Sequence, residues 1–154
     1  MTKRGTLYAY EFEILQGEKY LLAFPFDFAG GTQGESIKDV TENAADWLKM
    51  QLEERLMSNI EIPAATYGNE PKEGGRVLLV AIEASLDTID AVPAYKAAEM
   101  LGVSRGRVTQ MVGANLLDGF RKGRDAYVTI DSVNARLKES PKPGRPRREK
   151  VTSA

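Results

Sequence analysis

The chain has 154 residues, of which 42% are hydrophobic and 28% are charged, a balance that is typical of globular rather than disordered proteins. It contains no cysteine and no histidine, which excludes disulfides, thiol and imidazole catalysis, and zinc sites of the usual ligand types. The net charge of −1 conceals two opposite parts, because residues 1–90 carry 8 Lys and Arg against 16 Asp and Glu, whereas residues 91–154 carry 13 against 6.

The chain begins with a predicted β-hairpin. Thr6–Ile14 is rich in aromatic and branched residues that partly alternate with polar ones, which predicts a strand with one solvated face. Lys19–Pro25 predicts the returning strand, which ends at Pro25 because proline cannot donate to a ladder. The glycine-rich loop over residues 27–34 lacks the Lys-Ser/Thr pair of a P-loop, so we interpret it as a connection with a short third strand through Thr32 and Gln33.

A long helix is predicted over Ser36–Met57, because Ser36 followed by Asp39 resembles a capping box and one face is apolar. The residues of that face are Val40, Ala44, Trp47, Leu48, Gln51 and Leu56. We expect Trp47 to anchor the core against the hairpin. The continuous apolar run Arg76–Ala84 predicts a strand at the centre of the sheet, and residues 87–91 are the expected linker.

Several short motifs in this first part carry a family resemblance. They are Tyr20–Phe26 ahead of Thr32-Gln33-Gly34-Glu35-Ser36, then Ala44-Ala45 and Trp47-Leu48 in the helix, and Ile60-Glu61-Ile62-Pro63. Together they resemble HicB-type antitoxins over residues 6–84. The chain departs from the family at residues 26–31, where Pro-Asp-Leu-Pro-Gly-Cys is common. The resemblance implies a partial RNase H-like fold, neutralisation of a small basic mRNA-cleaving toxin of HicA type, and repression of the operon through a C-terminal DNA-binding domain.

Val92–Val112 predicts a helix-turn-helix. Pro93 suits a first helical turn, and Gly102 stops the first helix because a residue without Cβ adopts the left-handed conformation at little cost. Ser104 caps the second helix, in which an inward stripe of Val108, Met111 and Val112 leaves four polar side chains facing outward. Those four are Arg105, Arg107, Thr109 and Gln110, the residue types that contact base edges and phosphates.

Residues 116–130 predict a small hairpin whose turn is basic and contains glycine. Beside a recognition helix it would form a wing in which Arg121, Lys122 and Arg124 face phosphates. Asp131 or Ser132 is expected to cap a closing helix that carries Val133 and Leu137. Residues 92–139 resemble the winged helix-turn-helix of the excisionase and MerR-like group, in the Ala-Ala-x-x-Leu-Gly-Val-Ser opening and in the hairpin.

The tail from Ser140 is basic and rich in proline, and it is expected to be disordered in isolation. Its Gly-Arg-Pro motif resembles an AT-hook, in which an extended Arg-containing segment enters a narrow minor groove. A tail that contacts phosphates without sequence preference is the equally supported alternative. Arg145 and Arg147 would make the contacts in both interpretations.

The sequence therefore predicts an α+β protein: a small antiparallel-rich sheet with one long helix, then a winged helix-turn-helix and a basic tail. Three parts are predicted: a toxin-binding domain over residues 1–88, a DNA-binding domain over residues 92–139, and a basic flexible tail over residues 140–154. The predicted DNA-binding residues are Ser104, Arg105, Arg107, Thr109, Gln110, Arg121, Lys122, Arg124, Arg145 and Arg147.

The predicted function is that of an antitoxin which binds a HicA-like toxin and double-stranded operator DNA as a homodimer or higher oligomer, without a cofactor. A single short recognition helix reads few base pairs, so paired half-sites are expected. No membrane span or signal-peptide core is evident, which predicts a cytoplasmic protein.

Two alternatives remain from the sequence. The chain could be a phage-type DNA-binding regulator or excision factor without a toxin partner, although its long acidic part is more than such a factor needs. It could also be a metal-dependent RNase H-like nuclease. The carboxylates that such a nuclease would use are Glu11, Glu13, Asp27, Glu42, Asp46 and Glu83.

Overall fold

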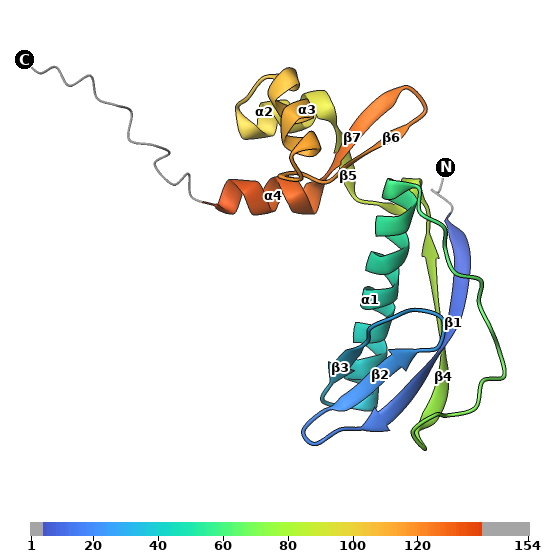
Figure 1. Ribbon diagram of the computed structural model, residues 1–154. Coiled ribbons are helices and arrows are strands. Elements are labelled where there is room, and N and C mark those ends of the chain that lie inside the picture. Colours follow the sequence, from blue (N-terminus) through green and yellow to red (C-terminus); the bar gives the residue numbers. More distant parts are fainter. Residues whose placement is uncertain (1–4, 140–154) are drawn as a thin grey trace, which may run out of the picture. The chain divides into compact units, whose positions relative to one another are not determined.

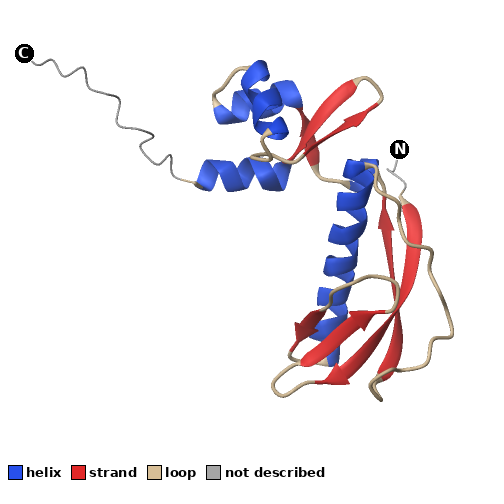
Figure 2. Ribbon diagram, in the orientation of Figure 1, coloured by secondary structure: helices blue, strands red, loops and turns tan. Residues whose placement is uncertain are grey.

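The computed structural model describes residues 5–139 as an α+β protein with antiparallel sheets and four α-helices (Figure 1 and Figure 2). The chain divides into two compact units, and the boundary between them in the sequence falls between Ile89 and Asp90. The expected linker over 87–91 is largely structured, because η1 (Leu86–Thr88) is a 3-10 helix and Ala91 begins a strand. None of the described helices combines the length and the apolar character that crossing a membrane requires.

Over residues 5–89, the N-terminal unit contains one sheet and one long helix. Its elements are β1 (Thr6–Gln16), β2 (Leu21–Pro25), β3 (Thr32–Gly34), α1 (Ile37–Ser58), β4 (Arg76–Ala84) and η1. The strands lie in the order β3-β2-β1-β4, and each neighbouring pair is antiparallel. The predicted order of strands and helix is confirmed, including the short strand through Thr32 and Gln33.

The prediction that Arg76–Ala84 lies at the centre of the sheet is wrong. β4 pairs only with β1 among the described strands, so it is an edge strand. Val80 and Ala84 are buried under α1, whereas Leu79 and Ala81 are exposed on the opposite face. An unbroken apolar run does not distinguish a strand buried on both faces from one that buries alternate residues.

The core of this unit lies between the inner face of the sheet and α1. Strand residues Tyr10, Phe12 and Ile14 are almost fully buried. Four helix residues at successive turns, Val40, Ala44, Leu48 and Leu52, have no exposed surface and form the buried stripe of α1. The Ser36 cap is confirmed, because the Ser36 hydroxyl accepts a hydrogen bond from the Asp39 N–H at 3.0 Å. The Asp39 carboxylate accepts from the N–H of Glu35 rather than of Ser36, so the cap is not a reciprocal box.

An aromatic cluster closes the core beside the loop between β2 and β3. Phe28 is 9% exposed, and its ring contacts Tyr10 and Trp47 edge-to-face, with centroids 4.8 and 5.9 Å away. Trp47 also meets Phe12 edge-to-face, as expected of a core anchor. The guanidinium of Arg55 lies 5.0 Å from the centroid of the Phe28 ring. The loop between β2 and β3 thus supplies an apolar residue to the core.

The alternation in β1 predicted that the outer face of the sheet is exposed to solvent. The structure shows that part of this face is covered. Glu13 is only 3% exposed, because the connection from α1 to β4 passes over it. The Glu13 carboxylate accepts hydrogen bonds from the backbone N–H groups of Lys72, Glu73 and Gly75 at 2.8 to 2.9 Å. Gly75 is required there, since a Cβ would lie 2.4 Å from the Ile14 carbonyl oxygen.

Two further carboxylates hold the same connection. Glu11 accepts from the backbone N–H groups of Gly68 and Asn69 at 3.0 and 2.9 Å. Asp27 accepts from the N–H and the hydroxyl of Thr66 at 2.9 and 2.7 Å. We call residues 66–75 the carboxylate-held segment. Hydrogen bonds to ionised acceptors are stronger than neutral ones, so this irregular segment has fixed anchors without secondary structure.

Over residues 90–139, the C-terminal unit contains three helices and a three-stranded antiparallel sheet of order β5-β7-β6. Its elements are β5 (Ala91–Pro93), α2 (Ala94–Leu101), α3 (Arg105–Gly113), β6 (Gly119–Lys122), β7 (Asp125–Thr129) and α4 (Ile130–Lys138). The sequence did not predict β5, which pairs with β7. Pro93 is the residue before the first helical position, and α4 is capped by Thr129 rather than by Asp131 or Ser132.

The carboxylate-held segment predicts an acid-sensitive N-terminal unit. Burial raises the pKa of Glu13, but the N–H donors of Gly75, Glu73 and Lys72 and the charge of Lys72 lower it more, so the pKa lies below 4.5. The N–H donors of Asn69 and Gly68 likewise lower the pKa of Glu11. These carboxylates therefore stabilise the fold fully above pH 4.5, and that stability is lost as the pH falls through the lower, folded-state values.

We expect Glu13→Gln to lower the urea midpoint of this unit at pH 7, because the carboxamide has one acceptor atom and presents an NH₂ to N–H donors. Fluorescence of Trp47, the single tryptophan, measures the transition. Glu83→Gln is the matched control, since Glu83 is exposed on the same face of the sheet. The difference between wild type and Glu13→Gln should shrink as the pH falls below 4.5. Equal midpoints for the two variants at pH 7 would contradict this account.

Candidate nucleic-acid interface

The turn between α2 and α3 is built as the sequence predicted. Gly102 has φ +66°, in the left-handed region, and its N–H donates back to Glu99 while the N–H of Val103 donates to Ala98. The Ser104 hydroxyl accepts from the N–H of Arg107 at 3.0 Å and caps α3. The last turn of α2 and the first of α3 thereby satisfy backbone groups that helix ends leave unpaired.

Packing against α2 decides which face of α3 is exposed. Ala97 has no exposed surface and Ala98 is 5% exposed, so α2 presents a flat, small-residue face. Val108 and Met111 of α3, at 1% and 4% exposure, pack in the same buried cluster. Val112 is partly buried beside them, which confirms the predicted inward stripe.

The predicted outward face of α3 is exposed. Its four polar side chains are all exposed to solvent: Arg105, Arg107, Thr109 and Gln110. Ser104 at the cap is exposed as well. The hydroxyl of Thr109 donates to the carbonyl of Arg105 at 3.2 Å, so it already has one partner within the helix. The guanidinium and carboxamide groups of this face are the types that read base edges.

The hairpin β6–β7 is stiffened by aromatic packing that the sequence analysis missed. The rings of Phe120 and Tyr127 are stacked at 16°, with centroids 5.7 Å apart, and Lys122 Nζ lies 5.2 Å from the centroid of Tyr127. Phe120 and Tyr127 are directly opposite in the ladder, so their type and position in the two strands were the available signal. A ribbon that is already ordered loses less backbone freedom when its side chains bind a ligand.

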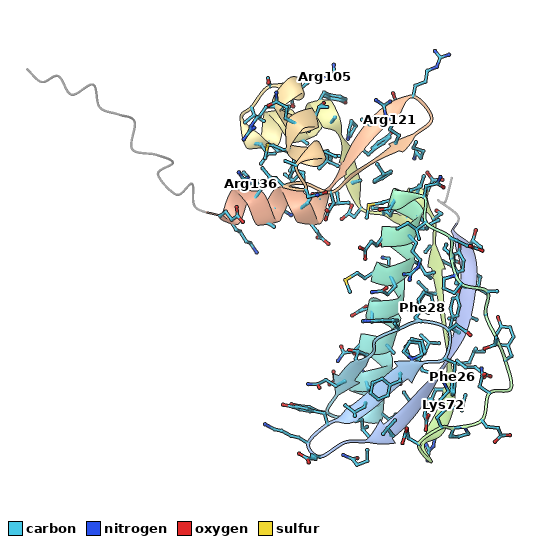
Figure 3. All side chains as sticks on the ribbon, viewed as in Figure 1. Phe26, Phe28, Lys72, Arg105, Arg121 and Arg136 are labelled. Atoms are coloured by element: carbon cyan, nitrogen blue, oxygen red, sulfur yellow. The ribbon has the colours of Figure 1, made fainter. Side chains whose placement is uncertain are left out.

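The base of the hairpin packs against α3. A Cβ on Gly119 would lie 3.0 Å from a methyl group of Val112, and the N–H of Leu116 donates to Met111. Arg121, Lys122 and Arg124 are all exposed around the turn, where Gly123 has φ +67°. Figure 3 labels Arg105 on α3 and Arg121 on the hairpin. The structure thus places the two predicted contact sets on α3 and on the hairpin that packs against it.

Two of the predicted DNA-binding residues, Arg145 and Arg147, are outside the residues that the structure describes. On α4, which carries both residues as predicted, Val133 is fully buried and Leu137 is 49% exposed.

The six carboxylates that a nuclease would use do not form a metal site among the described residues. Among residues 5–139, no three carboxylates gather closely enough to hold a metal ion. Glu11, Glu13 and Asp27 instead accept hydrogen bonds from the carboxylate-held segment. Glu42 and Asp46 lie exposed on α1, and Glu83 is exposed on β4.

Comparisons of the chain with protein families, with curated proteins and with solved structures gave no match. The assignment of a function therefore depends on the residues and their geometry.

The left-handed conformation of Gly102 allows a direct test of the turn between α2 and α3. Gly102→Ala should destabilise the C-terminal unit by about 1–2 kcal/mol, the cost of the left-handed conformation for a residue with a Cβ. Gly113→Ala is the control, because Gly113 ends α3 without positive φ and has open space around it, so this change should be neutral or slightly stabilising. Urea denaturation followed by far-UV circular dichroism measures the effect, and Trp47 fluorescence should not change. Equal stability of the two variants would contradict the described turn.

Proposed function

We propose that the C-terminal unit is a winged helix-turn-helix that binds double-stranded DNA, with α3 in the major groove and the β6–β7 turn on the phosphate backbone. The observation that carries the proposal is one exposed polar face, Arg105, Arg107, Thr109 and Gln110, on a helix whose other face is buried. The adjoining hairpin exposes Arg121, Lys122 and Arg124. Base contacts from a helix and phosphate contacts from a basic ribbon are complementary parts of such recognition.

We further propose that the N-terminal unit has the partial RNase H-like fold and neutralises a small basic toxin of HicA type, so that the whole chain is an antitoxin that represses its own operon. The order of three strands, a helix and a fourth strand is consistent with the HicB resemblance. The excess of acidic residues in this part favours a basic protein over nucleic acid. Asp46 and Glu54 are exposed along α1, as is Glu42, which pairs with Lys38.

Base reading on α3 is tested by the double variant Arg105→Ala with Gln110→Ala. Binding to the DNA upstream of the chain's own coding sequence is compared with binding to a shuffled sequence of the same length and composition. Loss of a base-reading contact should cost about 1–3 kcal/mol on the specific DNA and little on the shuffled DNA. Arg136→Ala on α4, where Arg136 pairs with Glu139 at 3.0 Å, also removes a charge and should keep the preference. An unchanged ratio of the two affinities in the double variant would refute base reading.

Phosphate contact by the hairpin has a different signature. Lys122→Ala should weaken binding to both DNA sequences alike and should reduce the slope of log K against log salt by about one unit. Titrations at several salt concentrations measure the slope, and Lys96→Ala on α2, paired with Glu99, is the control. A change in sequence preference, or a slope equal to that of wild type, would contradict the proposed contact between the hairpin and the phosphate backbone.

Toxin binding is tested by expressing the full chain together with the genes that flank it. We expect a small basic protein to co-purify, and we expect this chain to relieve the growth arrest which that protein causes alone. The double variant Arg105→Ala with Gln110→Ala should relieve the arrest equally, because it alters only the proposed DNA-binding face. If no flanking product arrests growth or binds the chain, the antitoxin proposal fails while DNA binding stands.

A further inference from the structure

Gly106, the second residue of α3, is not used by the function proposed above. The residue is exposed, and its φ does not lie in the left-handed region. Apart from the backbone of α3 and the chain neighbours, a Cβ on Gly106 would meet only Ser104 Oγ, at 3.9 Å, which is an ordinary contact. The fold therefore has room for a side chain at this position.

Nearly all other glycines among residues 5–139 are required by the fold. Each has a positive φ, as Gly102 does, or would bring a Cβ within 3.0 Å of another atom, as Gly75 would. Gly106 and Gly113 are the exceptions in this part of the chain. Glycine weakens a helix relative to alanine, because its backbone loses more freedom on folding. A helical glycine that the fold does not require is typical of a place where another molecule comes close to the backbone.

Gly106 lies at the centre of the exposed face of α3. Successive residues of an α-helix are about 100° apart around its axis, which places Gly106 about half a turn from the middle of the inward stripe. Arg105, labelled in Figure 3, and Arg107 flank it, and Gln110 lies one turn further along the same line. All three are exposed. Gly113 is on this face too, but it is the last residue of α3 and lies beyond the polar residues.

We propose that a base pair of the DNA comes closest to the α3 backbone at Gly106, and that the missing Cβ is what permits this approach. The inference rests on the proposed function, since it concerns the face that would lie in the major groove. Long side chains of a helix lean toward its N-terminus, so the reach of Gln110 includes the turn that contains Gly106. A carboxamide reads adenine through two hydrogen bonds at once, which requires a base edge at hydrogen-bond distance. A side chain at position 106 would hold that edge away.

A base edge fits this position better than a phosphate does. Arg105 and Arg107 have long side chains that contact phosphates without a close approach of the backbone. The space left by the missing Cβ matters for a group that must come directly to the helix, between these two arginines. Gly106 is thus a determinant of sequence preference, although it has no side chain to read bases.

The test is the DNA preference of the full chain with Gly106→Ala and with Gly106→Leu. Affinities are measured for the DNA upstream of its own coding sequence and for the shuffled sequence. We expect alanine to lower the affinity for the upstream DNA about tenfold and leucine to lower it further, because a side chain would overpack a tight contact. Affinity for the shuffled DNA should stay nearly unchanged, since nonspecific binding depends on phosphate contacts. Gly113→Ala and Gly113→Leu are the matched controls and should keep the wild-type preference.

Thermal melting followed by far-UV circular dichroism separates this role from a structural one. Alanine and leucine are better helix formers than glycine, so both Gly106 variants should melt at or above the wild-type temperature. A Gly106→Ala variant that melts below wild type would show that the fold requires the glycine, and this would overturn the inference. If the leucine variant does not fold, Gly106→Ala decides the test.

An unchanged preference in the folded Gly106 variants would also overturn the inference. So would an equal loss in the Gly113 variants, or an equal loss on both DNA sequences, which would indicate a phosphate at Gly106 instead. A wild-type chain that does not prefer its upstream DNA contradicts the proposed function, and the inference fails with it. A wild-type preference that the Gly106 variants keep contradicts the inference alone.

Discussion

The packing of α3 against the small-residue face of α2 is the constraint on which the C-terminal unit depends. Ala97 and Ala98 let the two helices approach closely, and Val108 and Met111 bury the facing side of α3. Burial of one face leaves the other to solvent, and the residues there are charged or polar. The left-handed Gly102 and the Ser104 cap fix where α3 begins. The exposed face is thus a consequence of core packing and not of α3 alone.

The carboxylates of the N-terminal unit fall into two groups. Glu11, Glu13 and Asp27 are engaged by donors of the carboxylate-held segment, so they stabilise the fold. Glu42, Asp46 and Glu54 instead lie exposed along α1, where Glu42 pairs with Lys38. This separation shows why an acidic composition alone does not identify a metal site. It also explains how a long connection without helix or strand stays attached to the sheet.

Local patterns in the sequence predicted the caps at Ser36 and Ser104, the turn at Gly102 and the order of most strands, because these depend on neighbouring residues, but they gave the wrong cap for α4. The same patterns did not reveal contacts between distant segments. The burial of Glu13 depends on a segment about sixty residues away, and the edge position of β4 depends on which strands pair. β5 was missed because it is three residues long, contains Pro93 and is a strand only through its pairing with β7. The exposure of Arg105 and Gln110 was predictable from helical periodicity, whereas the stacking of Phe120 on Tyr127 depends on the register between β6 and β7.

The central claim is that DNA contacts α3 and the β6–β7 turn. The most direct measurement is an amide NMR titration of the full chain with the DNA upstream of its own gene. The account predicts the largest shifts at Ser104–Gln110 and Arg121–Arg124, with small shifts on α1 and the sheet of the N-terminal unit. Shifts concentrated on the N-terminal unit, or on α4 with none on α3, would contradict it.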